Sequence, residues 1–273
     1  MSYTKLTDFA VKDALLSGNP AKVIRGVEFD AEFNAIVDAD ALNTKASTLA
    51  ASSGASLVGY LPAGTGAVAT TAQAKLRESV SIKDFGAVGN GTTDDTAAIT
   101  AALVASYHVV VPAGMFPLIS STIVVGAGQR LEFLGGNGND ASYSPASYIV
   151  KKSTMTTDAI QVEKTGVVTG GGIRGQLGNT GDGIALIGNS AKVSDFYVYQ
   201  IGGVGVRVGT TAGGNFNSFK LDNVTALSCT SHGFYIHDGK AAEGADANAG
   251  TLLHCVARDN GGDGIRVGHA FWN

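Results

Sequence analysis

Proline, charge and cysteine are all scarce in this chain of 273 residues. Its 5 prolines exclude a collagen or a proline-rich linker, and only 15% of its residues are charged. Two cysteines, Cys229 and Cys255, are too few for a scaffold held together by disulfides. We therefore expect two buried thiols in a chain assembled in a reducing cytosol, with a disulfide as the alternative.

Long apolar runs and an excess of positive charge are also missing. No stretch reaches the roughly 18 consecutive apolar residues of a membrane span, and the N-terminus lacks the apolar run of a signal peptide. A net charge of −4 provides no basic surface for DNA, RNA or anionic lipid. We expect no nucleic-acid partner and no membrane insertion, and a neutral glycan or another protein fits this composition better.

Glycine and apolar residues are abundant instead, and they divide the chain into three parts. The 38 glycines are about twice the average share, and 44% of the residues are hydrophobic, which favours a mainly β fold with many turns. Residues 1–48 are partly helical in pattern, and residues 49–80 have the small, polar, glycine-rich composition of a connector. Residues 81–273 alternate short β-branched bursts with turn residues.

The first part contains one apolar helical stripe. Phe29, Phe33 and Ile36 follow each other at +4 and +3, which places them on one face of a helix, and the stripe fades at Asp40 and Asn43. Two interpretations remain open. The helix is either a short amphipathic one packed on its own domain, or one whose apolar face meets copies of itself.

The stretch KDFGAVGNGTTDDTAAITAAL, residues 83–103, begins the third part. Its glycines have the order G-x-x-G-x-G and no P-loop lysine follows, so it is not a dinucleotide or phosphate cradle. Asp94 and Asp95 begin an alanine-rich segment at 94–106. A side-chain acceptor and a negative charge at this position suit the N-terminus of a helix. The sequence predicts a capped helix that covers the open end of a stack of strands, the first of them at His108–Val111.

An approximate repeat in the last third is the strongest internal evidence for the fold. Copies align on Gly205, Gly233 and Gly264, each followed by an apolar residue, and GDGIALIG at Gly183 resembles an earlier copy whose upstream half does not match well. At three fixed offsets upstream, every aligned copy has an apolar residue: Val193, Leu221 and Leu252; Phe196, Val224 and Cys255; Val198, Ala226 and Ala257.

The spacing between copies varies, which indicates a constant core with loops inserted on one side. A propeller would need longer repeats and a leucine-rich repeat its own motif, so we predict a parallel β-helix. Asn223 and Asn260 are expected to form side-chain ladders between its turns. Nothing resembling a terminal cap follows the last copy, so we expect these residues to be the front portion of a longer protein.

Aspartates in the repeat region are candidates for the paired carboxylates of a glycosidase or lyase. They are Asp182, Asp195, Asp222, Asp238, Asp259 and Asp263. Asp182 and Asp263 precede aligned glycines, with Val204 and His232 in the same place between them, and a turn that favours short polar residues explains this equally. No acid–base pair can be placed, so no catalytic residue is assigned. The histidines match no metal-ligand spacing, and we expect neither metal nor cofactor.

The opening of the third part resembles that of the pectate-lyase-like β-helix superfamily. SVSIKDFGAVGNGTTDDTAAITAALV, followed by VVVPAGMFPL, is similar to the pattern DFGA-x-G-D-G-x-x-DDT-x-A-x-x-A and PAG, with Asn90 where the family more often has aspartate. The residues that carry this opening motif are Asp84, Phe85, Gly86, Gly89, Gly91, Asp94, Asp95, Thr96, Pro112 and Gly114. The resemblance implies a right-handed parallel β-helix with an N-terminal capping helix, and the motif is not an active site.

The preceding residues resemble the virion-proximal end and connector of bacteriophage tail spike and tail fibre proteins. DFAVKDALLSGNPAKVIRGVEFDAEFNAIVDADALNTKA and LVGYLPAGTGAVATTAQAKLRESVSIKDFGA carry this similarity. It implies a virion-anchoring region at 1–48, a neck at 49–80, and the first turns of the β-helix at 81–273. It also implies a homotrimer with anchor and trimer contacts at Phe29, Phe33 and Ile36.

The partners implied are a baseplate, tail-tube or adaptor protein held through residues 1–60, and a capsule or lipopolysaccharide glycan of the host. The protein would be assembled in the host cytoplasm and located in the phage tail. Three functions compete: a structural virion protein, a complete glycan-depolymerising spike (glycoside hydrolase or lyase), and a cellular pectate-lyase-like enzyme. The third predicts a secretion signal, which is absent, and does not predict residues 1–60.

Overall fold

The computed structural model describes residue 6 and residues 8–23, 25–135, 146–210, 216–237, 247 and 249–268. The chain divides into two compact units, Met1–Leu76 and Arg77–Asn273. Each is described by itself, and the three-part division at 48/49 and 80/81 stays a prediction.

The first unit is built around one long helix, α2 (Gly26–Ala50). It is longer than the apolar stripe suggested, because alanine, leucine and lysine continue to favour helix after the stripe fades at Asp40. The N-terminal residues are tied to α2: Glu28 accepts hydrogen bonds from Lys12 Nζ at 2.6 Å and from Arg25 N at 3.0 Å. The other elements of this unit are α1 (Phe9–Asp13), η1 (Pro20–Lys22), η2 (Gly54–Leu57), the antiparallel pair β1 (Gly59–Tyr60) and β2 (Thr70–Thr71), and α3 (Ala72–Leu76).

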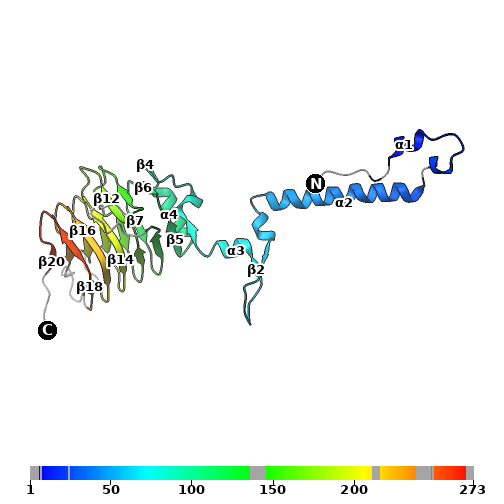
Figure 1. Ribbon diagram of the computed structural model, residues 1–273. Coiled ribbons are helices and arrows are strands. Elements are labelled where there is room, and N and C mark those ends of the chain that lie inside the picture. Colours follow the sequence, from blue (N-terminus) through cyan, green and yellow to red (C-terminus); the bar gives the residue numbers. More distant parts are fainter. Residues whose placement is uncertain are drawn as a thin grey trace. The chain divides into compact units, whose positions relative to one another are not determined.

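The second unit is mainly β and forms a parallel β-solenoid of about 6 turns, preceded by the small helical region (Figure 1). Helix α4 (Thr96–Ala105) lies at the end where the chain enters the solenoid, and buries Ile99, Ala102 and Leu103 in the common core. One sheet has the order β20–β17–β15–β13–β10–β7. Its strands are β7 (Ile123–Val125), β10 (Ile160–Val162), β13 (Ile184–Leu186), β15 (Val206–Val208), β17 (Phe234–Ile236) and β20 (Ile265–Val267).

The remaining strands form two more faces, which merge because β14 (Lys192–Tyr199) and β16 (Lys220–Leu227) are long enough to belong to both. The first of these faces contains β3 (Val80–Ser81), β5 (His108–Val111), β8 (Arg130–Phe133), β11 (Val167–Thr169) and β18 (Thr251–Leu253). The second contains β4 (Asn90–Asp94), β6 (Phe116–Ile119), β9 (Ile149–Lys151), β12 (Gly172–Gly175) and β19 (Val256–Arg258), and the short turn η3 (Ile82–Phe85) precedes β4.

The repeat alignment predicted from the sequence is the register of the solenoid. Val193 pairs with Leu221, and Leu221 pairs with Leu252, so the three side chains stack in one column. The earlier copy also belongs to the series, because Ile184 after Gly183 pairs with Val206. The aligned glycines are required by the stacking: a Cβ on Gly205 would lie 2.7 Å from the carbonyl oxygen of Gly233 on the next turn. The prediction of a parallel β-helix is thus confirmed.

The corners of the solenoid repeat as regularly as its strands. Non-glycine residues with left-handed backbone form columns along the corners, one of them Asp195, Asn223 and His254, with φ between 52° and 53°. Asn223 donates to Asp195 Oδ1 at 2.9 Å, and Asn260 donates to Ala226 O at 3.1 Å, so both predicted ladder residues join one turn to the next. Asparagine and aspartate tolerate left-handed backbone better than most residues, which suits Asp195, Asn223 and Asp259 to these positions.

Candidate functional site

The opening motif forms a hydrogen-bonded turn rather than a reactive site. Asp95 is 2% exposed and occupies the N-cap position of α4, but its carboxylate accepts from Val88 N at 2.7 Å and Gly89 N at 2.9 Å instead of capping the helix. Asp94 serves the helix end, accepting from Thr96 N at 3.0 Å. The expected cap is therefore divided between the two aspartates, because the glycine turn at 86–91 needs an acceptor of its own.

Hydrogen bonds keep Asp94 ionised. Partial burial by itself raises the pKa of this carboxyl, but hydrogen bonds from Ser120 and Thr96 outweigh it and hold the pKa below its ordinary value. A hydrogen-bonded carboxylate with a lowered pKa is suited to holding a fold together and poorly suited to proton transfer near neutral pH.

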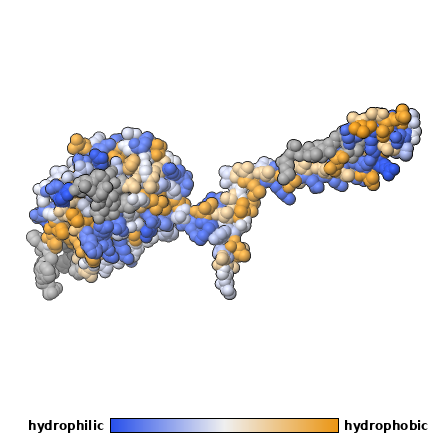
Figure 2. Space-filling model, viewed as in Figure 1, coloured by the Kyte–Doolittle hydropathy of each residue, from blue (hydrophilic) through white to orange (hydrophobic). Residues whose placement is uncertain are grey.

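The helical stripe of the first unit is at the surface. Phe29, Phe33 and Ile36 are 44%, 62% and 43% exposed on α2, and the rings of Phe29 and Phe33 are stacked with centroids 6.5 Å apart. Figure 2 shows apolar residues at the surface along the part of the chain that contains α1 and α2. Such a stripe on a 25-residue helix is a candidate contact surface.

Two of the carboxylates near the aligned glycines are joined by a buried arginine. Arg207 donates from Nε to Asp182 Oδ2 at 2.5 Å and from a terminal nitrogen to Asp158 Oδ2 at 2.7 Å. All three side chains are 12–16% exposed. Burial alone lowers the pKa of Arg207, but the bonds and attraction of Asp182 and Asp158 outweigh it and raise the pKa above its usual value.

Lys151 balances the second carboxylate charge of this cluster. Its side chain is fully buried, and its ammonium donates to Thr180 O at 2.6 Å and Asp182 O at 3.0 Å. The cluster thus contains two positive and two negative groups, in which Arg207 bonds both carboxylates and Lys151 bonds two backbone carbonyls. Both carboxylates are engaged by an arginine and neither is open to a substrate, so the arrangement stabilises turns and does not resemble an acid–base pair.

Asp158 was missed in the sequence although a signal was present. It precedes Ala159 and Ile160 as Asp182 precedes Gly183 and Ile184, and Ile160 pairs with Ile184 in the register. Alanine in place of the aligned glycine concealed this copy. His232 lies in the same column, where its Nδ1 accepts from Asp263 N at 2.8 Å.

The other predicted acids lie apart from one another. Asp195 accepts from Asn223, Asp222 forms ion pairs with Lys220 at 3.0 Å and His254 at 3.3 Å, and Asp259 lies 3.1 Å from Arg258 Nε. Asp263 is 60% exposed, and Asp238 lies outside the described residues. Among the described residues, no group of three or more acidic, histidine or cysteine side chains could hold a metal ion.

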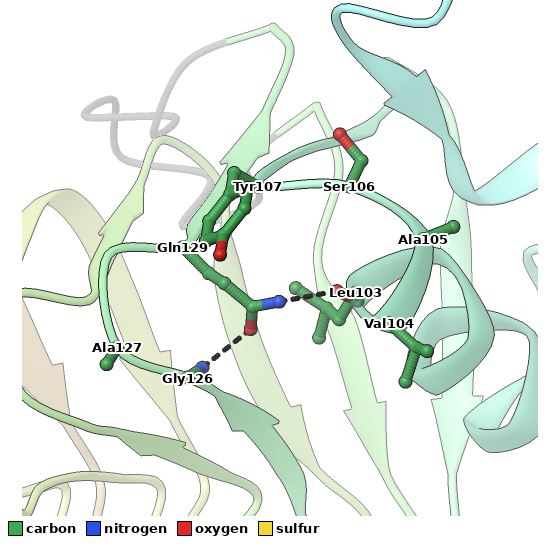
Figure 3. A pocket seen from close by; sticks show the side chains of 8 residues that line it. All are labelled: Leu103, Val104, Ala105, Ser106, Tyr107, Gly126, Ala127 and Gln129. Atoms are coloured by element: carbon green, nitrogen blue, oxygen red, sulfur yellow. Dashed lines mark hydrogen bonds between the residues drawn. The ribbon is translucent and has the colours of Figure 1, made fainter.

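Several hollows lie among the described residues of the solenoid unit. The one beside Asp94, Thr96 and Ser120, of about 720 Å³, is open and shallow, and two more are better enclosed. The first of these two, of about 300 Å³, lies between the C-terminal end of α4 and residues 126–129, where Gln129 donates to Leu103 O and accepts from Gly126 N at 2.7 Å (Figure 3). Its lining residues are uncharged. Both polar atoms of the Gln129 amide are used in hydrogen bonds that join the helix end to the turn, so the hollow offers little for binding a ligand.

The second hollow is a groove of about 470 Å³ on the outer side of β6, β9 and β12, and it is chemically richer. Aromatic, amide and guanidinium groups line it: Asn90, Gly91, Phe116, Tyr148, Val150, Arg174, Gly175, Gln176, Leu177 and Gln200. Sequence reasoning missed this groove, because its members come from five separate turns and follow no local motif. We refer to these ten residues as the aromatic groove.

The comparisons with known proteins agree with this fold. No protein-family model matches the chain. The pre-neck appendage proteins of Bacillus phages PZA and phi29 are each 27% identical over 210 residues, which is 70% of this chain and 21% of theirs, so the chain spans about a fifth of their length. The ORF18 protein of Geobacillus virus E2 shares the fold, with a TM-score of 0.55 at 20% identity, over 71% of this chain and 40% of that one. The predicted resemblance to phage spikes with a β-helix is confirmed: the homologues are phage appendage proteins and the structure is a β-solenoid.

Proposed function

We propose that this protein is a bacteriophage tail spike or tail fibre protein that attaches to the tail through its N-terminal region and presents its β-solenoid to a glycan of the host surface. Homology to phage pre-neck appendage proteins over 70% of the chain is the observation that carries this proposal. These homologues support a phage tail-associated protein located in the virion. Assembly of the protein in the host cytoplasm is part of the proposal.

The division of labour within the chain follows from its two units. Residues 1–60 contain α2 with its exposed apolar stripe, and we assign to them the contact with a baseplate, tail-tube or adaptor protein and the trimer contacts. The solenoid has one continuous, buried apolar core, which makes it suitable as a rigid support for a recognition surface. Among the described helices, none is long and apolar enough to cross a membrane.

Glycan recognition is supported by the chemistry of the aromatic groove. Flat aromatic rings beside amide groups suit sugars, whose C–H faces pack on rings and whose hydroxyls need donors and acceptors. Cleavage of the glycan by a complete depolymerase is the alternative, although the buried carboxylates described above are held by Arg207.

The test uses the purified chain with capsule and lipopolysaccharide from a susceptible host. We expect saturable binding, and competition between the free chain and the phage for adsorption to host cells. Shortened oligosaccharides in the same incubation would establish the depolymerase instead. Neither binding nor competition across a fair panel, together with absence of the chain from purified virions by mass spectrometry, would refute the assignment.

A further inference from the structure

We propose that the aromatic groove binds an acidic sugar residue of the glycan, with its carboxylate on Arg174 and the C–H face of its ring against Phe116 and Tyr148. The inference rests on the proposed glycan recognition and names the class of sugar, a hexuronic or sialic acid, and the place where it binds.

Two tilted aromatic rings provide the apolar part of the groove. Phe116 and Tyr148 lie on neighbouring turns, since Leu118 pairs with Val150 two residues further on. Their ring centroids are 4.6 Å apart at an interplanar angle of 44°. Val150, which is 9% exposed, lines the same groove. Polarised C–H groups of a pyranose face favour the negative face of aromatic rings, and the volume of about 470 Å³ lies in the range of small-ligand pockets.

The charge of the groove has one sign. Arg174 is the single ionised residue among the ten that line it, and none of the ten is acidic. Its guanidinium carbon lies 5.7 Å from the centroid of the Tyr199 ring, a stacking that restrains the side chain without neutralising it. Within the part of the chain that the structure describes, no carboxylate forms an ion pair with Arg174. An exposed, pre-positioned guanidinium with its paired N–H groups matches a carboxylate in shape and charge.

The amides complete a site for a hydroxylated ligand. Gln176 accepts from Ser153 N at 3.1 Å through Oε1, which fixes the orientation of its amide. No described residue accepts from its NH₂ group, and Gln200 from the next turn also lines the groove. Asn90, by contrast, is occupied in its own turn, where Oδ1 accepts from Thr93 N at 2.8 Å. The uncommitted NH₂ group of Gln176 and the guanidinium of Arg174 thus belong to one groove, which suits an anionic, hydroxylated ligand.

The test compares acidic oligosaccharides with neutral partners of the same backbone. The probe is an array of bacterial oligosaccharides containing hexuronic or sialic acids, each with its carboxyl-reduced counterpart, followed by calorimetric titration of the members that bind. We expect the native acids to bind at least about tenfold more tightly than the reduced forms, equivalent to about 1.4 kcal/mol. Arg174→Gln removes this preference, and Arg174→Lys, which loses the two-pronged geometry, retains part of it.

The matched control is Arg258→Gln. Arg258 lies in the same outward column as Arg174, three strands further along the solenoid, and is outside the groove. It should leave glycan affinity unchanged, and thermal melting should show all variants to be folded.

Each remaining outcome is decisive. Glycan binding with no preference for the acid, or undiminished by Arg174→Gln, overturns the inference and leaves glycan recognition standing. Binding to no glycan removes both. A change of oligomeric mass in Arg174→Gln, measured by light scattering, shows that the groove is a contact between copies of the chain and also overturns the inference.

Discussion

At the scale of single residues, the buried lysine has the clearest measurable consequence. Burial lowers the pKa of Lys151 to about 8 from 10.5, although attraction from Asp158 and Asp182 opposes the shift. The ammonium is therefore less stable in the folded chain than in water, and the cost at neutral pH is about 3 kcal/mol, at about 1.4 kcal/mol for each pH unit. Its two carbonyl partners recover part of the cost of burial.

We predict that stability rises with pH between about 8 and 10.5 because of this one group. In that interval the unfolded chain binds a proton that the folded chain has released, so the free energy of unfolding increases with pH. Below pH 8 both states bind the proton and the full penalty applies. Denaturant unfolding at pH 7, 8.5 and 10 should show the rise, and Lys151→Met should lack this contribution. Equal pH dependence in the two proteins would contradict the prediction.

The role of an individual side chain was harder to predict from the sequence than its position in the fold. Asp94 and Asp95 are adjacent and chemically alike, yet one serves the helix and the other the glycine turn, a difference decided by the backbone of residues 86–91. The arginine partner of Asp158, Arg207, is 49 residues away along the chain and becomes its neighbour only when three successive turns stack. Such pairings depend on loop lengths between turns, which no local pattern records.

At the scale of elements, the columns inside the solenoid were predictable because they repeat. Stacking requires an apolar residue at the same offset on every turn, and a glycine where two backbones come close. The spacing of these residues along the sequence therefore predicts the register of the strands. The length of α2 was not predictable from its stripe, since helix propensity continues through Ala46 and Leu49 after the apolar face ends. The left-handed backbone of corner residues such as Asp195, Asn223 and His254 was not predicted.

The columns predict which leucines matter for stability. Leu221 is fully buried between Val193 and Leu252, so Leu221→Ala should lower the free energy of unfolding by about 2–5 kcal/mol. Leu253 is the next residue on β18 after Leu252, but it points outward and is 39% exposed, so Leu253→Ala should cost less than about 1 kcal/mol. Denaturant unfolding of the two variants measures the difference. Similar losses would mean that Leu221 does not lie in the stacked core.

At the scale of the whole molecule, the outstanding question is what meets the apolar stripe of α2. A helix that exposes two phenylalanines and an isoleucine on one face is stabilised when that face is covered. The residues that precede α2 contact the helix but leave this stripe exposed. Leu6 N donates to Glu32 Oε2 at 3.0 Å, and Glu32 is 7% exposed, whereas Phe33 beside it is 62% exposed. Both interpretations of the stripe therefore remain testable, and we favour contact between three copies.

We predict that the full chain is a homotrimer and that Phe33→Asp disrupts it. A carboxylate buried at a helix contact without a partner is strongly unfavourable, so light scattering should find three times the chain mass for the wild type and a lower mass for the variant. Leu42→Asp is the matched control. It is 49% exposed on the same helix, and nine residues at about 100° each place it opposite Phe33. A monomeric wild type, or a trimer that survives Phe33→Asp as it survives Leu42→Asp, would exclude the stripe as the trimer contact and leave it for the tail protein.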